Sequence, residues 1–314
     1  MARKRSTEHA LTQNALKGMA LSIFAASCIA AMNLFAKLLG PYMGAMDVTF
    51  TRNVVSLLIL LCLMPFISGF RDLKTKRPLG HIVRALCGTA GLTFGFWTFQ
   101  LMPMSQATLF LFTQPLFVVL LSYPVLGEKV GWHRIAAVIV GFSGILIVAG
   151  GPTGDLPLSS MAIGLATGFF NATVAICLRW LGDTENAGRT VFYFLTFGMV
   201  ITGALVFSPL TDSHIPAMSW TSTVLLFSIG LGFFGTFSLI AKTQSYRLAP
   251  AAVITPTNYT IIIWAVIFDY FIWDKAPELR VLLGATIIIA SNLFIIYREN
   301  LLKKKAALIS SGLS

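Results

Sequence analysis

The chain has 314 residues, of which 56% are hydrophobic and only 11% are charged. A typical soluble domain carries roughly 25% charged residues, so this chain has more apolar surface than one soluble core can hide, and we expect lipid to cover it. The formal net charge of +11 does not indicate nucleic-acid binding, because the basic residues are scattered through short loops and form no stripe with stacking aromatic residues.

Ten apolar stretches are each long enough to form a membrane-spanning helix, which needs roughly 20 residues. In chain order they cover residues 16–38, 46–68, 80–101, 103–125, 132–150, 158–181, 189–208, 220–246, 249–272 and 279–297. Loops rich in glycine, proline and charge separate most of them. The third and fourth meet directly at Met102–Pro103, which predicts a tight corner. The fold class that we predict is an all-α integral membrane protein.

The basic residues of the loops predict how the chain crosses the membrane. Lysine and arginine are frequent in both tails and in the loops after the even-numbered spans, whereas the opposite loops hold mainly Lys275 and Arg280, balanced by Asp274 and Glu278. The positive-inside rule then places both termini in the cytoplasm. We expect a multi-pass protein of the bacterial inner (plasma) membrane, with a cytoplasmic N-terminal tail at 1–15 and a basic cytoplasmic C-terminal tail at 299–314.

Similar residues recur at an offset of about 147 between the two halves of the chain. The matched pairs are Leu101 with Leu248, Pro103 with Pro250, Thr108 with Thr255 and Thr113 with Thr260. Nearer the start of each half an offset of 142 fits better, as for Phe50 with Phe192. We therefore predict two five-helix repeats, 16–150 and 151–298. Because five is odd, the second repeat inserts upside down, an arrangement typical of secondary transporters whose substrate site lies near the midplane.

The most characteristic stretch is SQATLFLFTQPLFVVLLSYPVLGEKVGWHRIAAVIVGFSGILIV at 105–148. An apolar helix with a central proline, then Gly-Glu, then a glycine-spaced helix resembles the drug/metabolite transporter superfamily in its EamA-type ten-helix branch. DVTFTRN (47–53) and RPLGHIVRALCGTAG (77–91) look like the sub-branch that includes bacterial S-adenosylmethionine uptake carriers and riboflavin importers. The resemblance covers 16–298. One departure is that the second repeat has Asp274-Lys275 where the first has Gly127-Glu128.

Polar side chains inside the spans are candidate substrate ligands, because an unpaired polar group in lipid costs several kcal/mol. In the fold that the resemblance implies, the first, third, fourth, sixth, eighth and ninth helices wall a central cavity. The substrate-binding candidates on these helices are Asn33, Trp97, Gln114, Asn171, Thr257, Asn258 and Tyr259. The alternative is hydrogen bonding between helices for the polar residues, and a membrane-interface anchor for Trp97.

Two prolines are candidate hinges. Pro115 and Pro256 lie in the fourth and ninth spans, where proline removes a backbone donor and clashes with the preceding turn.

Three basic residues are candidate gates. Lys37 and Arg52 are expected near the outer face, where they either snorkel or form a cationic gate with Asp47 or Asp269. Lys242 lies several residues inside the eighth span. A charge in a span is a functional candidate, and snorkelling to the cytoplasmic face is the alternative.

The predicted function is a secondary transporter that moves a small polar metabolite by alternating access. The resemblance adds uptake of S-adenosylmethionine or riboflavin. Export of amino acids or drugs is the alternative within transport, and a membrane-embedded enzyme or sensor is the alternative of another class. The cysteines and histidines have no metal or catalytic spacing, so we expect no cofactor, no metal and no enzymatic activity.

The expected partners are a small-molecule substrate and the lipid bilayer, with no nucleic acid; a homodimer is compatible with the sequence. Asp269 is a carboxylate within a predicted span, and it lies near the outer end of that span. Proton-driven carriers keep a titratable group deep in the membrane, so the sequence favours exchange or facilitated movement over strong proton coupling.

Overall fold

The computed structural model describes residues 2–66, 74, 75, 77–127, 131–150, 156–181, 187–209, 213, 220–249 and 251–310. Every regular element in these ranges is a helix. The elements are α1 (Ala2–Leu39), α2 (Ala45–Leu63), η1 (Met64–Phe66), α3 (Pro78–Leu101), α4 (Met104–Leu111), α5 (Gln114–Leu126), α6 (Trp132–Val148), α7 (Leu158–Leu181), α8 (Ala187–Val206), α9 (Ser222–Leu248), α10 (Ala251–Ile254), η5 (Thr255–Tyr259), α11 (Thr260–Trp273) and α12 (Leu279–Ser310).

The predicted spans reappear as helices of membrane-crossing length. Eight segments of the described chain are long and apolar enough to cross a bilayer, and α6 is a shorter apolar helix. The remaining predicted span corresponds to α10, η5 and α11 in succession. Many large apolar side chains point outward, among them Leu79, Trp132 and Phe271. The chain is an all-α membrane protein, as predicted.

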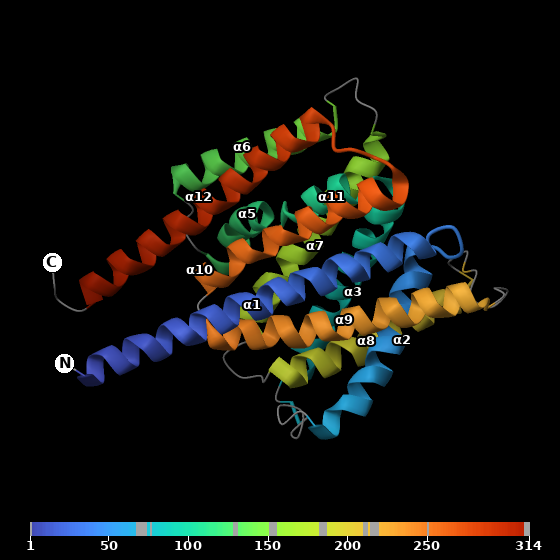
Figure 1. Cartoon of the computed structure of the whole chain (residues 1–314), viewed down its shortest axis with the longest axis horizontal. Coiled ribbons are helices and arrows are strands. Elements are labelled where there is room, and N and C mark those ends of the chain that lie inside the picture. The colour runs from blue at the N-terminus through green and yellow to red at the C-terminus, as the bar shows by residue number, and fades with distance from the viewer. Residues whose placement is uncertain are drawn as a thin grey trace.

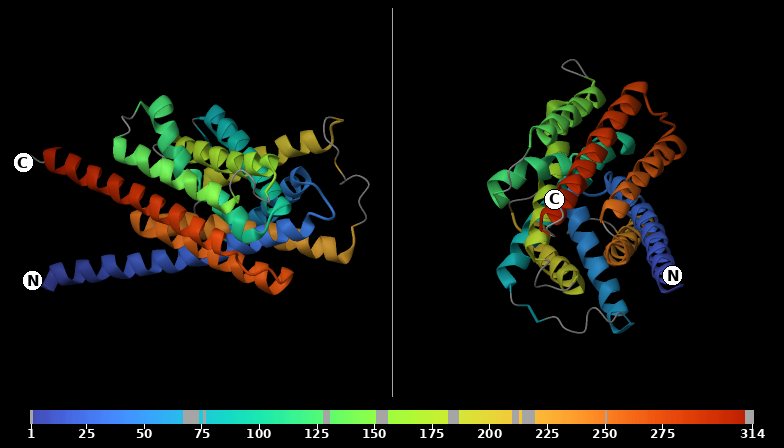
Figure 2. Two further views of the ribbon diagram at one scale, coloured as in Figure 1. Left: turned by 90° about the horizontal axis from the view of Figure 1, so that it is seen from above. Right: turned by 90° about the vertical axis from the view of Figure 1, so that its left-hand side faces the viewer.

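Both termini lie at the same end of the molecule, which we call the tail end (Figures 1 and 2). Helix α1 runs from this end to the opposite one, the far end, and α12 returns from the far end to the tail end (Figure 1). Helices α6 and α12 cross at one edge of the bundle, whereas α1 and α9 lie side by side in the other part (Figure 1).

Helix packing has an approximate two-fold pattern. Helix α1 packs on α9 and α3 on α7, while α2 packs on α8, α6 on α12 and α4 on α11. If every span is replaced by the span five places away in the chain, the pair α1–α9 becomes the pair α7–α3. The pairs α2–α8, α6–α12 and α4–α11 each become themselves. The helices therefore meet as two similar sets of five would.

Glycine allows α2 and α9 to pack closely in the core. The Ser56 hydroxyl on α2 donates to the Gly232 carbonyl on α9 over 3.0 Å. A Cβ atom at Gly232 would lie 2.3 Å from Cγ1 of Val55, a separation that packed carbon atoms do not tolerate. Glycine at this position is what lets α2 and α9 pack backbone to side chain.

Candidate functional site

The fourth span is not a continuous helix. Helix α4 ends at Leu111, a turn occupies Phe112 and Thr113, and α5 begins at Gln114. Pro115 lies in the first turn of α5, where its missing N–H group would have no helical partner in any case. The proline therefore lies just after a tight turn that interrupts the α-helical hydrogen bonding of the span Met104–Val125.

The ninth span is broken at the equivalent place. A 3-10 segment at Thr255–Tyr259 contains Pro256, and α11 begins at Thr260, 147 residues after Thr113. Broken helices in membranes leave backbone groups without helical partners, and these are tolerated only inside protein or along a water-filled cavity. In transporter folds, such discontinuous helices form the substrate and ion sites.

Aromatic and amide groups meet at the first break. The ring of Tyr259 packs edge-on against Phe112, with centroids 4.9 Å apart. The carbonyl of Phe112 accepts a hydrogen bond of 2.9 Å from Nδ2 of Asn292, which is fully buried on α12. Sequence reasoning missed Asn292, although a lone amide in an otherwise apolar last span was the available signal.

The other predicted residues of the fourth and ninth spans have different surroundings. Gln114 and Asn258 are half-buried at the two breaks, and neither side-chain amide has a hydrogen-bond partner among the described residues. The Thr257 hydroxyl lies 2.6 Å from that of Ser22 on α1 and 2.7 Å from the carbonyl of Ile254. Thr257 therefore ties η5 to α1, whereas the two amides are available to a ligand.

The remaining substrate-binding candidates lie on other helices. Asn33 on α1 is buried, and its Nδ2 has no partner in the described chain. Oδ1 of Asn171 on α7 packs against α3 where Gly91 has no side chain, 2.9 Å from the position of a Cβ. Trp97 is 42% exposed and stacks on Phe94. The two asparagines face neighbouring helices, and the tryptophan ring reaches the surface.

Lys37 binds the end of α3 at the far end of the molecule. Its ammonium donates to the carbonyls of Phe99 (3.0 Å) and Met102 and lies over the ring of Trp273 at 5.1 Å from the centroid. Positive charge is favourable at a helix C-terminus. The ammonium thus stabilises the last turn of α3, immediately before the predicted tight corner.

Asp269 binds the start of α4 on the other side of the same corner. The carboxylate on α11 accepts the N–H groups of Met104 (2.8 Å) and Ser105 (2.7 Å) and the Ser105 hydroxyl (2.7 Å). Negative charge at a helix N-terminus is favourable for the same electrostatic reason. We call Lys37 and Asp269 together the corner clasp, because opposite charges hold the two helix ends that meet there.

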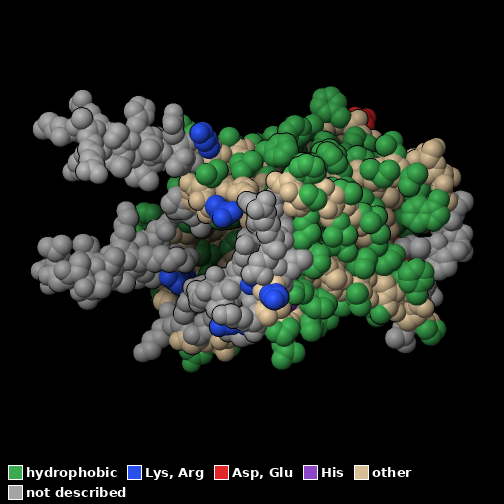
Figure 3. Space-filling model, turned by 90° about the horizontal axis from the view of Figure 1, so that it is seen from below, with side chains coloured by type: hydrophobic (Ala, Val, Ile, Leu, Met, Phe, Trp, Pro, Cys, Tyr) green, Lys and Arg blue, Asp and Glu red, His purple; other side chains and the backbone are tan. Residues whose placement is uncertain are grey.

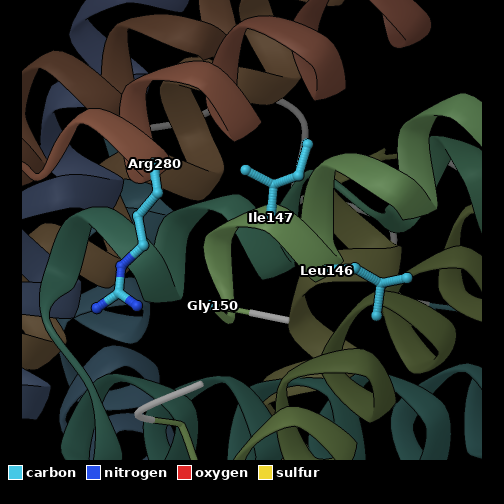
Figure 4. Close-up of a pocket in the computed structure, with 4 residues that line it drawn as sticks. All are labelled: Leu146, Ile147, Gly150 and Arg280. Atoms are coloured by element: carbon cyan, nitrogen blue, oxygen red, sulfur yellow. The ribbon is translucent and has the colours of Figure 1, made fainter. Parts of the chain in front are cut away.

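Two surface hollows of about 410 Å³ each open at the far end. One is lined by Lys37, Leu38, Gly40, Pro41, Gln100 and Trp273, so it lies beside the corner clasp. The other is lined by Leu146, Ile147, Gly150 and Arg280, where the ends of α6 and α12 meet (Figure 4). Arg280 forms an ion pair with Glu278.

The position of Arg52 differs from the prediction. It does not snorkel to the outer face but is only 2% exposed, because α2 packs between α8 and α9. Its Nη1 donates to Oδ1 of Asn53 over 3.1 Å. Asp47, considered above as a gate partner, accepts a hydrogen bond from Ser213. Arg52 is therefore part of the protein interior.

Arg84 on α3 is a second buried arginine, and sequence reasoning did not single it out. It is 7% exposed, and its guanidinium carbon lies 3.9 Å from the ring centroid of Phe194 on α8. The guanidinium carbon of Arg52 lies 5.6 Å from the same centroid. Lys242 on α9, in contrast, is half-buried and lies apart, less than two turns from the helix end at Leu248.

A bundle of membrane-crossing helices with two broken spans facing each other defines a polytopic transporter. The model of the EamA-like transporter family matches residues 16–150 and 158–297. The chain belongs to this family and is a small-metabolite transporter.

Similar proteins extend over nearly the whole chain. An uncharacterized transporter of Helicobacter pylori is 28% identical over 89% of this chain and 94% of its own length. The S-adenosylmethionine uptake transporter of Rickettsia felis is 30% identical, covering 86% of this chain and 88% of the relative. The riboflavin transporter of Vibrio cholerae is 26% identical over 79% and 81%. A solved crystal structure shares the fold, with a TM-score of 0.52 at 16% identity over 91% and 96%.

Proposed function

We propose that the protein takes up S-adenosylmethionine, or a metabolite built like it, across the bacterial inner membrane. The observation that carries this proposal is the alignment of 86% of the chain with an S-adenosylmethionine uptake transporter at 30% identity. The riboflavin transporter is less similar and covers less of the chain. Transport, rather than catalysis, is the activity that we assign.

We propose that transport proceeds by alternating access between two inverted repeats, 16–150 and 151–298. The packing pattern of the helices supports this organisation, and so do the breaks at Phe112–Thr113 and Thr255–Tyr259. Lysine and arginine side chains gather toward the tail end (Figure 3). By the positive-inside rule the tail end is cytoplasmic, with both termini inside.

We propose that the substrate binds along the two breaks. Gln114 and Asn258 supply amide donors and acceptors without the cost of a buried charge, and Tyr259 supplies a ring beside Phe112. Pro115 and Pro256 keep the two spans from closing into continuous helices. Asn33 and Asn171 extend the polar surface along α1 and α7.

The test is counterflow in proteoliposomes that contain the purified protein. Vesicles are loaded with unlabelled S-adenosylmethionine, and entry of the labelled compound is followed in the absence of any ion gradient. We expect trans-stimulated uptake that unlabelled S-adenosylmethionine inhibits and riboflavin does not. Trans-stimulated entry of riboflavin alone would make the chain a riboflavin carrier. Entry of neither compound would overturn the proposal.

Uptake and export are separated in intact cells. Cells that express the protein are expected to accumulate external labelled S-adenosylmethionine faster than cells that carry the empty vector. Faster loss of preloaded label, without faster entry, would support the export alternative.

A further inference from the structure

Two arginines share one aromatic ring in the interior of the bundle. Arg52 on α2 and Arg84 on α3 both lie within the roughly 6 Å at which a cation interacts with a ring face, and the ring is that of Phe194 on α8. Arg52 follows the start of α2 by about 10 Å, and Arg84 follows the start of α3 by about 9 Å. Since α2 starts at the far end and α3 at the tail end, the two side chains reach toward each other from opposite membrane faces.

The two guanidinium groups carry more N–H donors than the surrounding described residues offer acceptors. Each arginine carries five N–H donors, and the partner that the described chain offers is Oδ1 of Asn53 for Arg52. Nε of Arg52 and both Nε and Nη1 of Arg84 are buried without a hydrogen-bond partner. The ion pair found in the described residues joins Arg280 to Glu278 at the far end, away from both.

Other polar groups without partners point into the same region. Nδ2 of Asn53 on α2 and Oγ1 of Thr89 on α3 are both buried and unpaired in the described structure. Both face Gly198 on α8, at 2.9 Å and 3.1 Å from the position that a Cβ would occupy. Donors from two helices therefore converge where α8 carries no side chain.

Two further glycines let neighbouring groups pack close to the charges, and the place of a Cβ at Gly88 already lies 2.8 Å from the ring of Phe194. A Cβ at Gly235 on α9 would lie 3.1 Å from Nε of Arg52, and one at Gly88 would lie 3.6 Å from Nη1 of Arg84. The charges also break the two-fold pattern, because Phe194 is the counterpart of Arg52 at the offset of 142. The first half of the chain supplies the two arginines, and the second half supplies the ring of Phe194 and the glycines Gly198 and Gly235.

This arrangement is costly unless an anion completes it. Burying a charge without a partner costs several kcal/mol, and charges in membrane spans are rare and tied to transport pathways. A cation–π contact offsets only part of this cost. Two uncompensated guanidiniums repel each other, and a carboxylate between them would accept from both in the planar geometry that arginine favours.

We propose that Arg52 and Arg84, with Asn53 and Thr89, form a site for the carboxylate of the transported metabolite. The site deepens the function proposed above and rests on it. It assigns the substrate to the carboxylate-bearing metabolites. S-Adenosylmethionine belongs to this class through its amino-acid end, whereas riboflavin has no carboxylate. The breaks in the fourth and ninth spans are then left to recognise the rest of the molecule.

The first test compares S-adenosylmethionine with its decarboxylated analogue. Binding of both compounds to the purified wild-type protein is expected to differ by at least about tenfold in Kd, in favour of the carboxylate. Arg84→Gln and Arg52→Gln should each remove most of this preference, Arg84→Lys should restore part of it, and Arg280→Gln should leave it unchanged. Equal affinities in the wild type, or an undiminished preference in both glutamine variants, would overturn the site.

A second test needs no knowledge of the substrate. The melting temperature of the detergent-solubilised protein is measured in acetate, sulfate and chloride at equal ionic strength. Acetate should raise the melting temperature of the wild type above its value in chloride, and Arg84→Gln should abolish the rise. Without ligand, Arg84→Gln should melt no lower than the wild type, because it removes an unpaired buried charge. A rise with sulfate as large as that with acetate would reassign the site to oxyanions in general and overturn its restriction to carboxylates.

The two proposals fail in different ways. Transport of S-adenosylmethionine without a carboxylate preference, in a protein that acetate does not stabilise, would remove the anion site and keep the transport function. Stabilisation by acetate that depends on Arg84, in a protein that moves no S-adenosylmethionine, would keep the site and remove the assigned substrate.

Discussion

Lys37 and Asp269, near the far end, each bind a helix terminus. Lys37 meets the carbonyls that end α3, and Asp269 meets the N–H groups that begin α4. Each charge is thus compensated by backbone dipoles of the sign that a helix terminus presents. Arg52 and Arg84 lack such compensation, and this contrast distinguishes charges that stabilise the fold from charges available to a ligand.

Asp269→Asn is expected to destabilise the protein. The substitution replaces a carboxylate that accepts three hydrogen bonds by an amide with one acceptor oxygen, and hydrogen bonds to a charged group contribute about 1.5–3 kcal/mol. We expect the free energy of unfolding to fall by about 1–3 kcal/mol, seen as a lower melting temperature in detergent. Asp274→Asn, at an exposed position, is the control and should melt like the wild type. Equal melting of both variants would contradict the role of the clasp.

Gln114→Leu and Asn258→Leu are expected to weaken substrate binding. Each substitution removes a side-chain amide that has no partner in the described protein. A polar group of the substrate would then be buried without a hydrogen bond, which costs about 1–3 kcal/mol of binding free energy. Stability should change little, because leucine is well tolerated in a span. Affinity for labelled S-adenosylmethionine and melting temperature are measured on the same purified variants. Lost stability with intact affinity would make these amides structural.

At the scale of elements, hydrophobic periodicity and loop residues sufficed to predict the ten spans and the corner at Met102–Pro103. They did not reveal that a turn or a 3-10 segment interrupts each span next to its proline, since a regular helix and an interrupted one have the same composition. At the sequence departure, Gly127 (φ 68°) and Asp274 (φ 52°) end α5 and α11 in the same left-handed conformation, while Glu128 lies outside the described residues. These two positions share a backbone conformation although their side chains differ.

The candidate site was harder to predict than the spans. Polar residues in apolar helices could be found, but which helix each one faces depends on packing between distant segments. Asn292 was missed because it binds a carbonyl 180 residues away, and Arg84 because its partner ring lies on α8. Arg52 was predicted near the outer face because its position in the second span does not reveal which helices pack around it.

Pro115→Ala and Pro256→Ala are expected to slow transport without preventing insertion. Alanine restores an N–H donor and favours a continuous helix through the break, so exchange of S-adenosylmethionine in counterflow should be slower. Pro124→Ala, an exposed proline in the same helix α5, is the matched control. Unchanged exchange in both hinge variants would remove the prolines from the mechanism.

Gly168→Ala tests how tightly α7 packs on the first break. A Cβ at Gly168 would lie 1.9 Å from Oγ1 of Thr113, which donates to the carbonyl of Phe110. One of the two helices must shift, and overpacking costs about 1–3 kcal/mol. The variant should melt below the wild type, whereas Gly131→Ala, which has no atom within 4 Å, should not. Normal melting of Gly168→Ala would show that the turn yields readily.

At the scale of the whole molecule, the two ends differ in charge. The tail end carries the lysines and arginines that Figure 3 shows, while the far end carries the clasp and the Arg280–Glu278 pair. By the positive-inside rule, this difference and the even number of spans predict a cytoplasmic tail end with both termini inside.

Reporter fusions test this orientation. A fusion after Pro78, at the start of α3, should report a cytoplasmic location, and one after Glu278, just before α12, an external one. The measurement is paired phosphatase and fluorescent-protein activity in intact cells. The same location for both fusions would contradict an odd number of spans between the two positions.

Among the described side chains, the carboxylate of the corner clasp has no counterpart at the tail end; the side chain of Arg179, the counterpart of Lys37 at the offset of 142, lies outside them. Ser122, the counterpart of Asp269 at the offset of 147, keeps its hydroxyl on the carbonyl of Val118 in its own helix. In a carrier that alternates between two faces, unequal fastening makes one resting face more populated, tenfold for about 1.4 kcal/mol. The electrochemical gradient alone determines how far the substrate accumulates. The apparent affinity for substrate on each side of the membrane, however, depends on how often the carrier is open to that side. The half-saturation concentrations for entry and exit would therefore differ, so that the carrier loads from one side at lower concentrations than from the other.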